Sequence, residues 1–305
     1  MTFQLPPSDD VIAAALAEDL GVAPERIVEP SLAGASLLDW DVTSSAIVPE
    51  AAVFAGRIVC RQAGVVCGLP LVARLYEVLS RACEAWPVEC FPLVAEGTAV
   101  AGGTAVMEIE GSARVVLAGE RSALDFLMVL SGIATEARAW QRAAGDRVAV
   151  VDTRKTLPGM RSLSKYAVGV GGAHNHRAGL WDMVLIKDNH IGHAGGARAA
   201  VIAARAAHPE LLVECEADSI DQAVAAARAG ADYVLLDNMD DGLLARAVRA
   251  VHEAAGDRAC STEASGGITI ERVPSIAATG VDRISTSALT LARPIDFGLD
   301  EIGDE

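Results

Sequence analysis

The amino-acid sequence predicts an α/β protein that begins with a small α/β sandwich and continues as a parallel α/β barrel. Between Ala52 and Val116, short β-like runs are separated by glycine turns. After Glu120, strand-like apolar segments alternate with Ala-rich helical segments, a rhythm that is typical of a parallel sheet with short loops. With 305 residues, of which 51% are hydrophobic, the chain can bury a large core.

The first half is expected to contain two helices and several short strands. The first helix ends at Gly21, where glycine can adopt the left-handed conformation that closes a helix, and a polar stretch follows to about Thr43. A second helix-like segment covers residues 70–84. Strands are predicted at 52–61, 64–70, 104–111 and 113–119.

The second half is expected to contain strands that alternate with helices. Polar residues stand at the ends of these strands, and in a closed barrel such ends meet at one mouth, where the fold keeps its chemistry. The G-x-G-x-x-G turn of an open dinucleotide-binding sheet is absent from the sequence, which favours the barrel. The predicted strands are 147–153, 182–188, 211–217, 232–238, 259–267 and 282–287.

The composition excludes several classes of partner. A net charge of −16 argues against nucleic acid or an anionic membrane. No apolar run reaches the ~18 residues of a membrane span, and the start MTFQLPPSDD lacks the features of a signal peptide, so a cytoplasmic location is expected. The six cysteines contain no C-x-x-C pair and are expected to be buried free thiols.

All three lysines, Lys155, Lys165 and Lys187, and four of the six histidines lie between residues 155 and 193, whereas the other cationic side chains are arginines. From Thr153 to Lys187, six cations oppose one anion, so the local net charge is +5. Because a lysine ammonium and an arginine fork are not interchangeable, three lysines kept in one window indicate a chemical site. A positive pocket in an acidic protein suits a multiply anionic small molecule.

Two other patterns fall at strand ends. Glu216 and Asp237 end successive strands and could converge on Mg²⁺, which takes one or two carboxylates and fills its other positions with water and phosphates; alternatively, each caps the next helix. The run Ser265-Gly266-Gly267 is expected to lead from a strand into a helix, whose N-terminus can bind phosphate, and Ser285 follows one unit later.

The histidines do not indicate zinc. His174 and His176 are two residues apart, and His190 and His193 do not form an H-E-x-x-H pair. No cysteine lies near them, so a zinc site is not expected. His176 stands beside Arg177, which indicates an anion or hydrogen-bond contact.

Eight segments together resemble the quinolinate phosphoribosyltransferase family, also called carboxylating nicotinate-nucleotide pyrophosphorylases. They are E-R-S-A-L-D-F-L…S-G-I-A-T (120–135), D-T-R-K-T-L-P-G-M-R (152–161), K-Y-A-V-G-V-G-G-A-H-N-H-R (165–177), L-I-K-D-N-H-I (185–191), E-C-E (214–216), L-L-D-N (235–238), E-A-S-G-G-I (263–268) and G-V-D-R-I-S (280–285). The resemblance implies a sandwich domain at 1–117, an incomplete, seven-stranded TIM-like barrel with the active site at 118–289, and a tail, 290–305, packed back on the first domain. It also implies a homodimer or higher oligomer with shared active sites.

The resemblance implies roles for individual residues. Arg154, His176, Arg177 and Lys187 would hold the two carboxylates of quinolinate, with Arg121 reaching in from the other subunit. Lys155 would contact phosphoribosyl pyrophosphate, and Glu216 and Asp237 would bind the magnesium pyrophosphate or the ribose hydroxyls. Ser265, Gly266, Gly267 and Ser285 would bind the 5-phosphate. The chain departs from the family pattern at Asp125, Ala173, Ser287 and Leu291-Ala292.

The expected activity is therefore a Mg²⁺-dependent transfer of phosphoribose to quinolinate with decarboxylation, giving nicotinate mononucleotide, pyrophosphate and CO₂ in NAD biosynthesis. Three alternatives remain open at this point. One is a paralogue of the same fold that uses another aromatic acid. A second is a Schiff-base barrel lyase, because Lys155 and Lys187 end barrel strands and a desolvated lysine can attack a carbonyl. The third is a metabolite-binding protein without catalysis.

Overall fold

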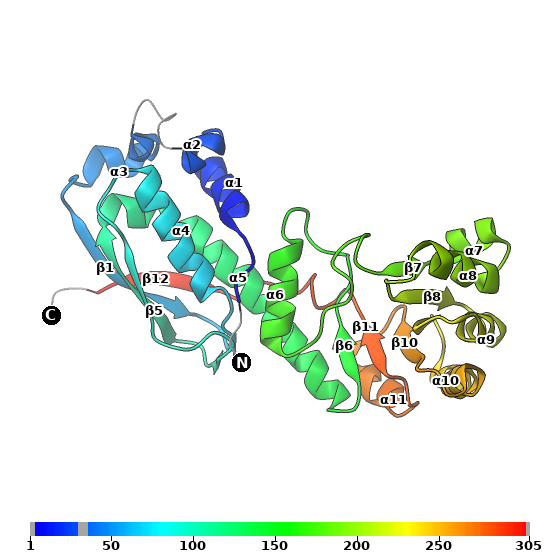
Figure 1. Ribbon diagram of the computed structural model, residues 1–305. Helices are drawn as coiled ribbons and strands as arrows, with labels where there is room; N and C mark the ends of the chain where they lie inside the picture. Colours follow the sequence, from blue (N-terminus) through cyan, green and yellow to red (C-terminus); the bar gives the residue numbers. More distant parts are fainter. Residues whose placement is uncertain (1–3, 30–35, 303–305) are drawn as a thin grey trace. The chain divides into compact units, whose positions relative to one another are not determined.

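The computed structural model describes residues 4–29 and 36–302 and separates into two units (Figure 1). The first unit holds the described residues up to Glu136, together with Leu157–Gly171 and the segment from Ala292 onward. The second unit holds Ala137–Thr156 and Gly172–Leu291. These two units differ from the domains predicted from the sequence, which have a boundary between residues 117 and 118. The domain boundary at that position stays a prediction.

The first unit contains a four-stranded sheet in the order β12-β1-β5-β3. The strand β12 comes from the C-terminal end of the chain and pairs antiparallel with β1, with Glu301 opposite Gly56. A separate two-stranded sheet pairs β2 with β4. The strands are β1 (Val53–Cys60), β2 (Gly64–Val65), β3 (Glu89–Pro92), β4 (Ala99–Val100), β5 (Thr104–Ser112) and β12 (Phe297–Glu301).

The first unit contains both of the helices that the sequence predicts for this half of the chain. The first ends as predicted at Gly21, which has a φ of 64°. The second is α4, which buries Leu71, Leu75 and Tyr76 on one face. The helices are α1 (Asp9–Leu20), α2 (Glu25–Val28), η2 (Leu37–Trp40), α3 (Val42–Ile47), α4 (Leu69–Ala82), the first part of α5 (Ala113–Ala144) and α6 (Arg161–Gly171).

Two strand predictions in this half are wrong. Residues 113–119, which were expected to be a strand, form the first turns of α5, and the strand expected at 64–70 is only the two-residue β2. Packing explains the first error: a Cβ added to Gly119 would meet Tyr76 and the leucines of α4, so this segment lies close against that helix. Tertiary contact of this kind overrides the β propensity of neighbouring valines.

The second unit contains a six-stranded parallel sheet in the order β6-β11-β10-β9-β8-β7, and each of its strands coincides with a predicted one. The helices of this unit lie along the sheet (Figure 1). The strands are β6 (Ala149–Val151), β7 (Val184–Ile186), β8 (Val213–Ala217), β9 (Tyr233–Asp237), β10 (Ser261–Ser265) and β11 (Arg283–Ser285). The helices are α7 (Asp188–Ala194), α8 (Ala197–Ala207), α9 (Ile220–Ala229), α10 (Asp241–Ala255), η3 (Ile270–Arg272) and α11 (Val273–Ala277).

The predicted α/β class is confirmed, but the barrel is not closed by strand pairing. In place of a seventh strand, a single parallel bridge joins Val151 of β6 to His174. Within residues 4–29 and 36–302, no strand ladder connects that bridge to β7. The sheet is therefore an open arc whose six strand ends carry the polar residues discussed below.

Two further expectations concern thiols and membranes. All six cysteines are free, and four of them are buried, as predicted, whereas Cys83 and Cys90 are partly exposed. None of the helices in the described part of the chain combines the length and the apolar character needed to cross a bilayer.

Candidate active site

Two adjoining cavities open at the carboxyl ends of the parallel strands in the second unit. The larger, here called the loop cavity, has a volume of about 500 Å³ and is bordered by Glu216, Asp237 and the Gly266–Gly267 turn. The smaller, here called the arginine cavity, has a volume of about 190 Å³ and is bordered by Arg154 and Arg177.

Every site residue predicted for the second unit borders one or both cavities. Arg154, His176 and Arg177 line the arginine cavity, and Glu216, Asp237, Gly266 and Gly267 line the loop cavity. Both cavities share Lys155, Lys187, Ser265 and Ser285. They also share Thr153 and Leu235, which are not among the predicted site residues.

Two arginines meet in the arginine cavity. Burial lowers the pKa of the Arg177 guanidinium, and the positive charge of Arg154 lowers that pKa further. The Nε atom of Arg154 is buried and has no hydrogen-bond partner in the described part of the chain. Two like charges brought together out of water destabilise the ligand-free chain, whereas an anion between them can be gripped by both forks.

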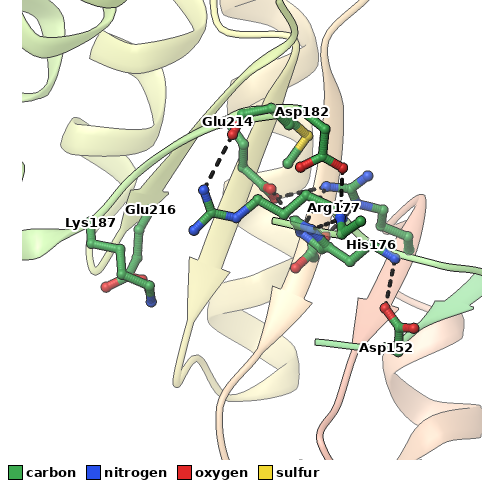
Figure 2. Close-up of polar contacts among 11 residues, drawn as sticks. Asp152, His176, Arg177, Asp182, Lys187, Glu214 and Glu216 are labelled. Atoms are coloured by element: carbon green, nitrogen blue, oxygen red, sulfur yellow. Dashed lines mark hydrogen bonds and ion pairs between the residues drawn. The ribbon is translucent and has the colours of Figure 1, made fainter. Parts of the chain in front are cut away.

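The segment that carries His176 and Arg177 is fixed by two aspartates (Figure 2). Asp152, just after β6, accepts a hydrogen bond from the backbone N–H of His176 at 2.8 Å. Asp182 accepts hydrogen bonds from the backbone N–H groups of Ala178 and Gly179 at 2.6 and 3.0 Å. The backbone is thereby tied down on both sides of Arg177, which orients its side chain.

A buried ionic cluster lies beside the arginine cavity. The Nε2 atom of His176 is 2.9 Å from Oε2 of Glu214 and 3.5 Å from Oε2 of Glu263, and Arg283 pairs with both glutamates. Burial opposes ionisation of Glu214, yet contacts with His176 and Arg283 hold its pKa below the usual value. Burial and the charge of Glu214 raise the pKa of Glu263 to about 7.

Glu263 and Arg283 are not among the site residues predicted from the sequence, and Glu214 is predicted only as part of a motif. The available signal was a charged residue inside an otherwise apolar strand, since Glu214 precedes Glu216 by two positions and so shares its side of the strand. His176, Glu214 and Glu263 are close enough together to hold a metal ion. The guanidinium of Arg283 already pairs with both carboxylates, which argues against that use.

Glu216 and Asp237 border the loop cavity, and Lys187 forms an ion pair with Glu216 there. Nζ of Lys187 is 2.9 Å from Oε2 of Glu216, and the two side chains point toward each other from neighbouring strand ends (Figure 2). Oδ2 of Asp237 accepts a hydrogen bond from the side chain of Asn238 at 2.6 Å. Oxygen ligands of this kind, in a cavity with room for phosphates and water, suit Mg²⁺.

The glycine turn differs from the expectation in one respect. Gly266 and Gly267 have φ values of 91° and 55°, a left-handed backbone that favours glycine. The turn does not enter an α-helix directly, because η3 starts at Ile270 and α11 at Val273. Pro274 explains the delay, since proline is accepted only in the first turn of a helix. The loop backbone, not a helix N-terminus, borders the cavity.

Some predicted residues lie outside the cavities. Lys165 is buried on α6 of the first unit and borders neither cavity. Arg121 lies on α5 of the first unit, exposed, with NH1 3.3 Å from the Asp125 carboxylate. Of the departures from the family pattern, Ser287 and Leu291 border the loop cavity.

Comparisons with known proteins agree over most of the chain. Sequence models of quinolinate phosphoribosyl transferase match residues 41–131 for the N-terminal domain and 133–300 for the C-terminal domain. A Synechocystis protein named probable nicotinate-nucleotide pyrophosphorylase (carboxylating) is 41% identical over 235 residues, which cover 76% of this chain and 77% of that protein. A Mycobacterium leprae protein with the same name, without "probable", is 38% identical over 265 residues, covering 85% and 90%. The crystal structure of NadC from Streptococcus pyogenes superposes with a TM-score of 0.85 at 33% identity and covers 99% of this chain and 100% of that one.

Proposed function

The chain belongs to the quinolinate phosphoribosyltransferase family, and we propose that it transfers phosphoribose from phosphoribosyl pyrophosphate to the ring nitrogen of quinolinate. The products are nicotinate mononucleotide, pyrophosphate and CO₂, a step of NAD biosynthesis. The family predicted from the sequence motifs is thus confirmed. The observation that carries the activity is the meeting of Arg154 and Arg177 in one cavity, because two apposed guanidiniums call for an anionic ligand.

Quinolinate occupies the arginine cavity in this proposal. Arg154 and Arg177 can each pair with a carboxylate through two hydrogen bonds, and Lys187 adds a third positive charge at the border with the loop cavity. His176 borders the same cavity, and its Nδ1 accepts the backbone N–H of Arg177 at 2.7 Å. The ring therefore also helps to set the backbone of the arginine beside it.

The phosphoribosyl donor occupies the loop cavity. Lys155 supplies a cation, and the hydroxyls of Ser265 and Ser285 supply hydrogen-bond donors at its wall. Gly266 and Gly267 have no side chains, so a phosphate can approach their backbone closely. Because Lys155 and Lys187 border both cavities, the donor and the acid meet where these lysines stand.

Glu216 and Asp237 would hold Mg²⁺ together with the phosphates of the donor. Both offer carboxylate oxygens in the loop cavity, and Lys187 neutralises Glu216 in the ligand-free chain. When bound, Mg²⁺ offsets the negative charge of the departing pyrophosphate. The residues of the chain then have three tasks, which are to align the ring nitrogen with the anomeric carbon, to neutralise the two carboxylates and to exclude water.

Decarboxylation follows from the chemistry of the substituted ring. Once the ring nitrogen is bonded to ribose, it carries a positive charge next to the carbon that loses its carboxylate. The electron pair left on that carbon is stabilised by the adjacent charge, so the chain needs to supply no covalent intermediate. The cations of the arginine cavity hold the second carboxylate, which remains on the product.

We also propose a homodimer or higher oligomer in which Arg121 of one chain completes the arginine cavity of another. Support comes from the position of Arg121 on an exposed part of α5, where only the carboxylate of Asp125, four residues on, offers it an ion pair among the described residues. A fourth cation is useful because the acid and the donor together carry more negative charge than the second unit neutralises.

The Schiff-base alternative fits less well. Nζ of Lys187 lies 2.9 Å from the Glu216 carboxylate and the side chain is half exposed, whereas a Schiff-base lysine needs desolvated surroundings. The deciding experiment incubates the chain with quinolinate, phosphoribosyl pyrophosphate and Mg²⁺ and separates the nucleotides by chromatography. Nicotinate mononucleotide should form only when all three are present. Its absence with a folded chain would reject the proposed function in favour of the paralogue or the binding protein.

A further inference from the structure

We propose that Asn238 is a positioning residue that ties the Asp237 carboxylate to the Gly266–Gly267 turn. In this arrangement the metal-binding side and the phosphate-binding side of the loop cavity are set by one side chain. The inference rests on the proposed function in so far as it assigns the donor and Mg²⁺ to this cavity. Asn238 borders the cavity and is not among the residues proposed to bind the donor, Mg²⁺ or quinolinate.

The contacts of Asn238 run to both sides of the cavity. Its side-chain Nδ2 donates a hydrogen bond to Oδ2 of Asp237 at 2.6 Å, and its backbone N–H donates to the carbonyl of Ser265 at 3.0 Å. On the other side, a Cβ added to Gly266 would overlap the Asn238 side-chain oxygen and come within 2.9 Å of the Asn238 backbone nitrogen. The asparagine side chain therefore fills the space that the glycine leaves.

The backbone of Asn238 has an unfavourable conformation that supports a functional role. Its φ is 55°, and Glu84 is the only other non-glycine residue with a positive φ in the described ranges 4–29 and 36–302. Asparagine tolerates this region better than most residues, but a strained backbone persists only where its surroundings impose it. Asn238 is exposed, so core packing does not require this conformation.

The hydrogen bond also decides which oxygen of Asp237 can meet a cation. The donor Nδ2 engages Oδ2, and in the described part of the chain Oδ1 has no hydrogen-bond partner. The hydrogen bond restrains rotation of the Asp237 carboxylate, so that Oδ1 points in a fixed direction. A metal ion then binds a side chain that is already ordered. Loss of the amide frees that rotation and, at the same time, opens space beside Gly266.

The test uses Asn238→Gly, because glycine accepts the left-handed backbone and only the side-chain contacts are lost. Isothermal titration calorimetry should show at least tenfold weaker binding of phosphoribosyl pyrophosphate with Mg²⁺, whereas binding of quinolinate alone stays within twofold of wild type. The matched control is Glu84→Gly, which relieves the other positive φ in the first unit and should leave both affinities unchanged. A crystal structure of Asn238→Gly should show a rotated Asp237 carboxylate and a shifted Gly266–Gly267 turn.

Several results would overturn the positioning role. One is donor binding within twofold of wild type, and another is an equal loss of quinolinate binding, which would indicate a general disturbance of the mouth. An unmoved Asp237 and glycine turn in the variant crystal structure would do the same. Failure of the proposed function looks different, because the wild-type chain would then make no nicotinate mononucleotide, while the crystallographic comparison would still decide whether Asn238 holds Asp237.

Discussion

Replacing Lys187 with alanine should remove catalysis and leave the fold stable. The Lys187–Glu216 ion pair is 2.9 Å long, and its side chains are 51% and 17% exposed. A pair this open to solvent contributes about 0–1 kcal/mol, so the melting temperature should fall by no more than about 4 °C. In the ligand complex, by contrast, the lost cation leaves a substrate carboxylate unpaired in a closed site, at a cost of about 2–5 kcal/mol.

That cost corresponds to a loss in kcat/KM for quinolinate of about 30-fold to several thousandfold. The assay follows pyrophosphate release at saturating donor and Mg²⁺, and a thermal melt of the same preparation reports on the fold. Arg57→Ala is the matched control, because Arg57 and Glu108 form a 2.8 Å ion pair whose side chains are 50% and 36% exposed, on β1 of the first unit. It should show a similar melting temperature with wild-type kcat/KM.

Two results would refute the reasoning for Lys187. One is a kcat/KM within threefold of wild type, which would remove the lysine from substrate binding. The other is a fall in melting temperature far larger than that of Arg57→Ala, because the loss of activity would then reflect unfolding.

Three further predictions concern the oligomer, the buried cluster and the apposed arginines. Mixing inactive Arg121→Ala chains with inactive Lys187→Ala chains should restore some activity, because one mouth of a mixed dimer is then wild type; no recovery after demonstrated subunit exchange would place Arg121 outside the partner's site. Because the pKa of Glu263 is raised from 4.5 to about 7 in the fold, the folded chain keeps a proton that the unfolded chain loses, and wild-type stability falls as the pH rises between those values. As the pH rises from 4.5 to 7, the free energy of unfolding of Glu263→Gln should therefore increase relative to that of wild type by up to about 3 kcal/mol, measured by urea unfolding. If the difference in unfolding free energy between variant and wild type is the same at both pH values, the raised pKa is wrong. Arg154→Met should raise the ligand-free melting temperature by removing a like charge next to Arg177 and should abolish the rise that quinolinate causes in wild type; a lower ligand-free melting temperature would contradict the repulsion.

The sequence predicted the parallel sheet well because β-like segments alternate with Ala-rich helical segments, and polar residues stand at the strand ends. It failed at residues 113–119, where neighbouring valines suggested a strand but close packing of Gly119 against α4 favours a helix. Of the incomplete, seven-stranded barrel that was predicted, six strands are present, and His174 contributes one bridge where the seventh was expected. Pairing between distant segments cannot be read from local periodicity.

For the site, charged residues at strand ends were predictable from type and position. The link between Asn238 and Gly266 was not, because it depends on a left-handed backbone and on a contact between residues from different β–α units. Lys165 shows the limit of sequence proximity, because it is near the other lysines in sequence but borders neither cavity.

The central claim is that the arginine cavity recognises two carboxylates. The most direct test measures kcat/KM for quinolinate and for nicotinate, which has one carboxylate, at the same donor and Mg²⁺ concentrations. With Arg154, Arg177 and Lys187 around the cavity, nicotinate leaves one of these cations without its carboxylate, and we expect discrimination of about 10⁴ or more. If nicotinate is used within tenfold of quinolinate, the cavity does not recognise two carboxylates, and the chain acts on a different aromatic acid.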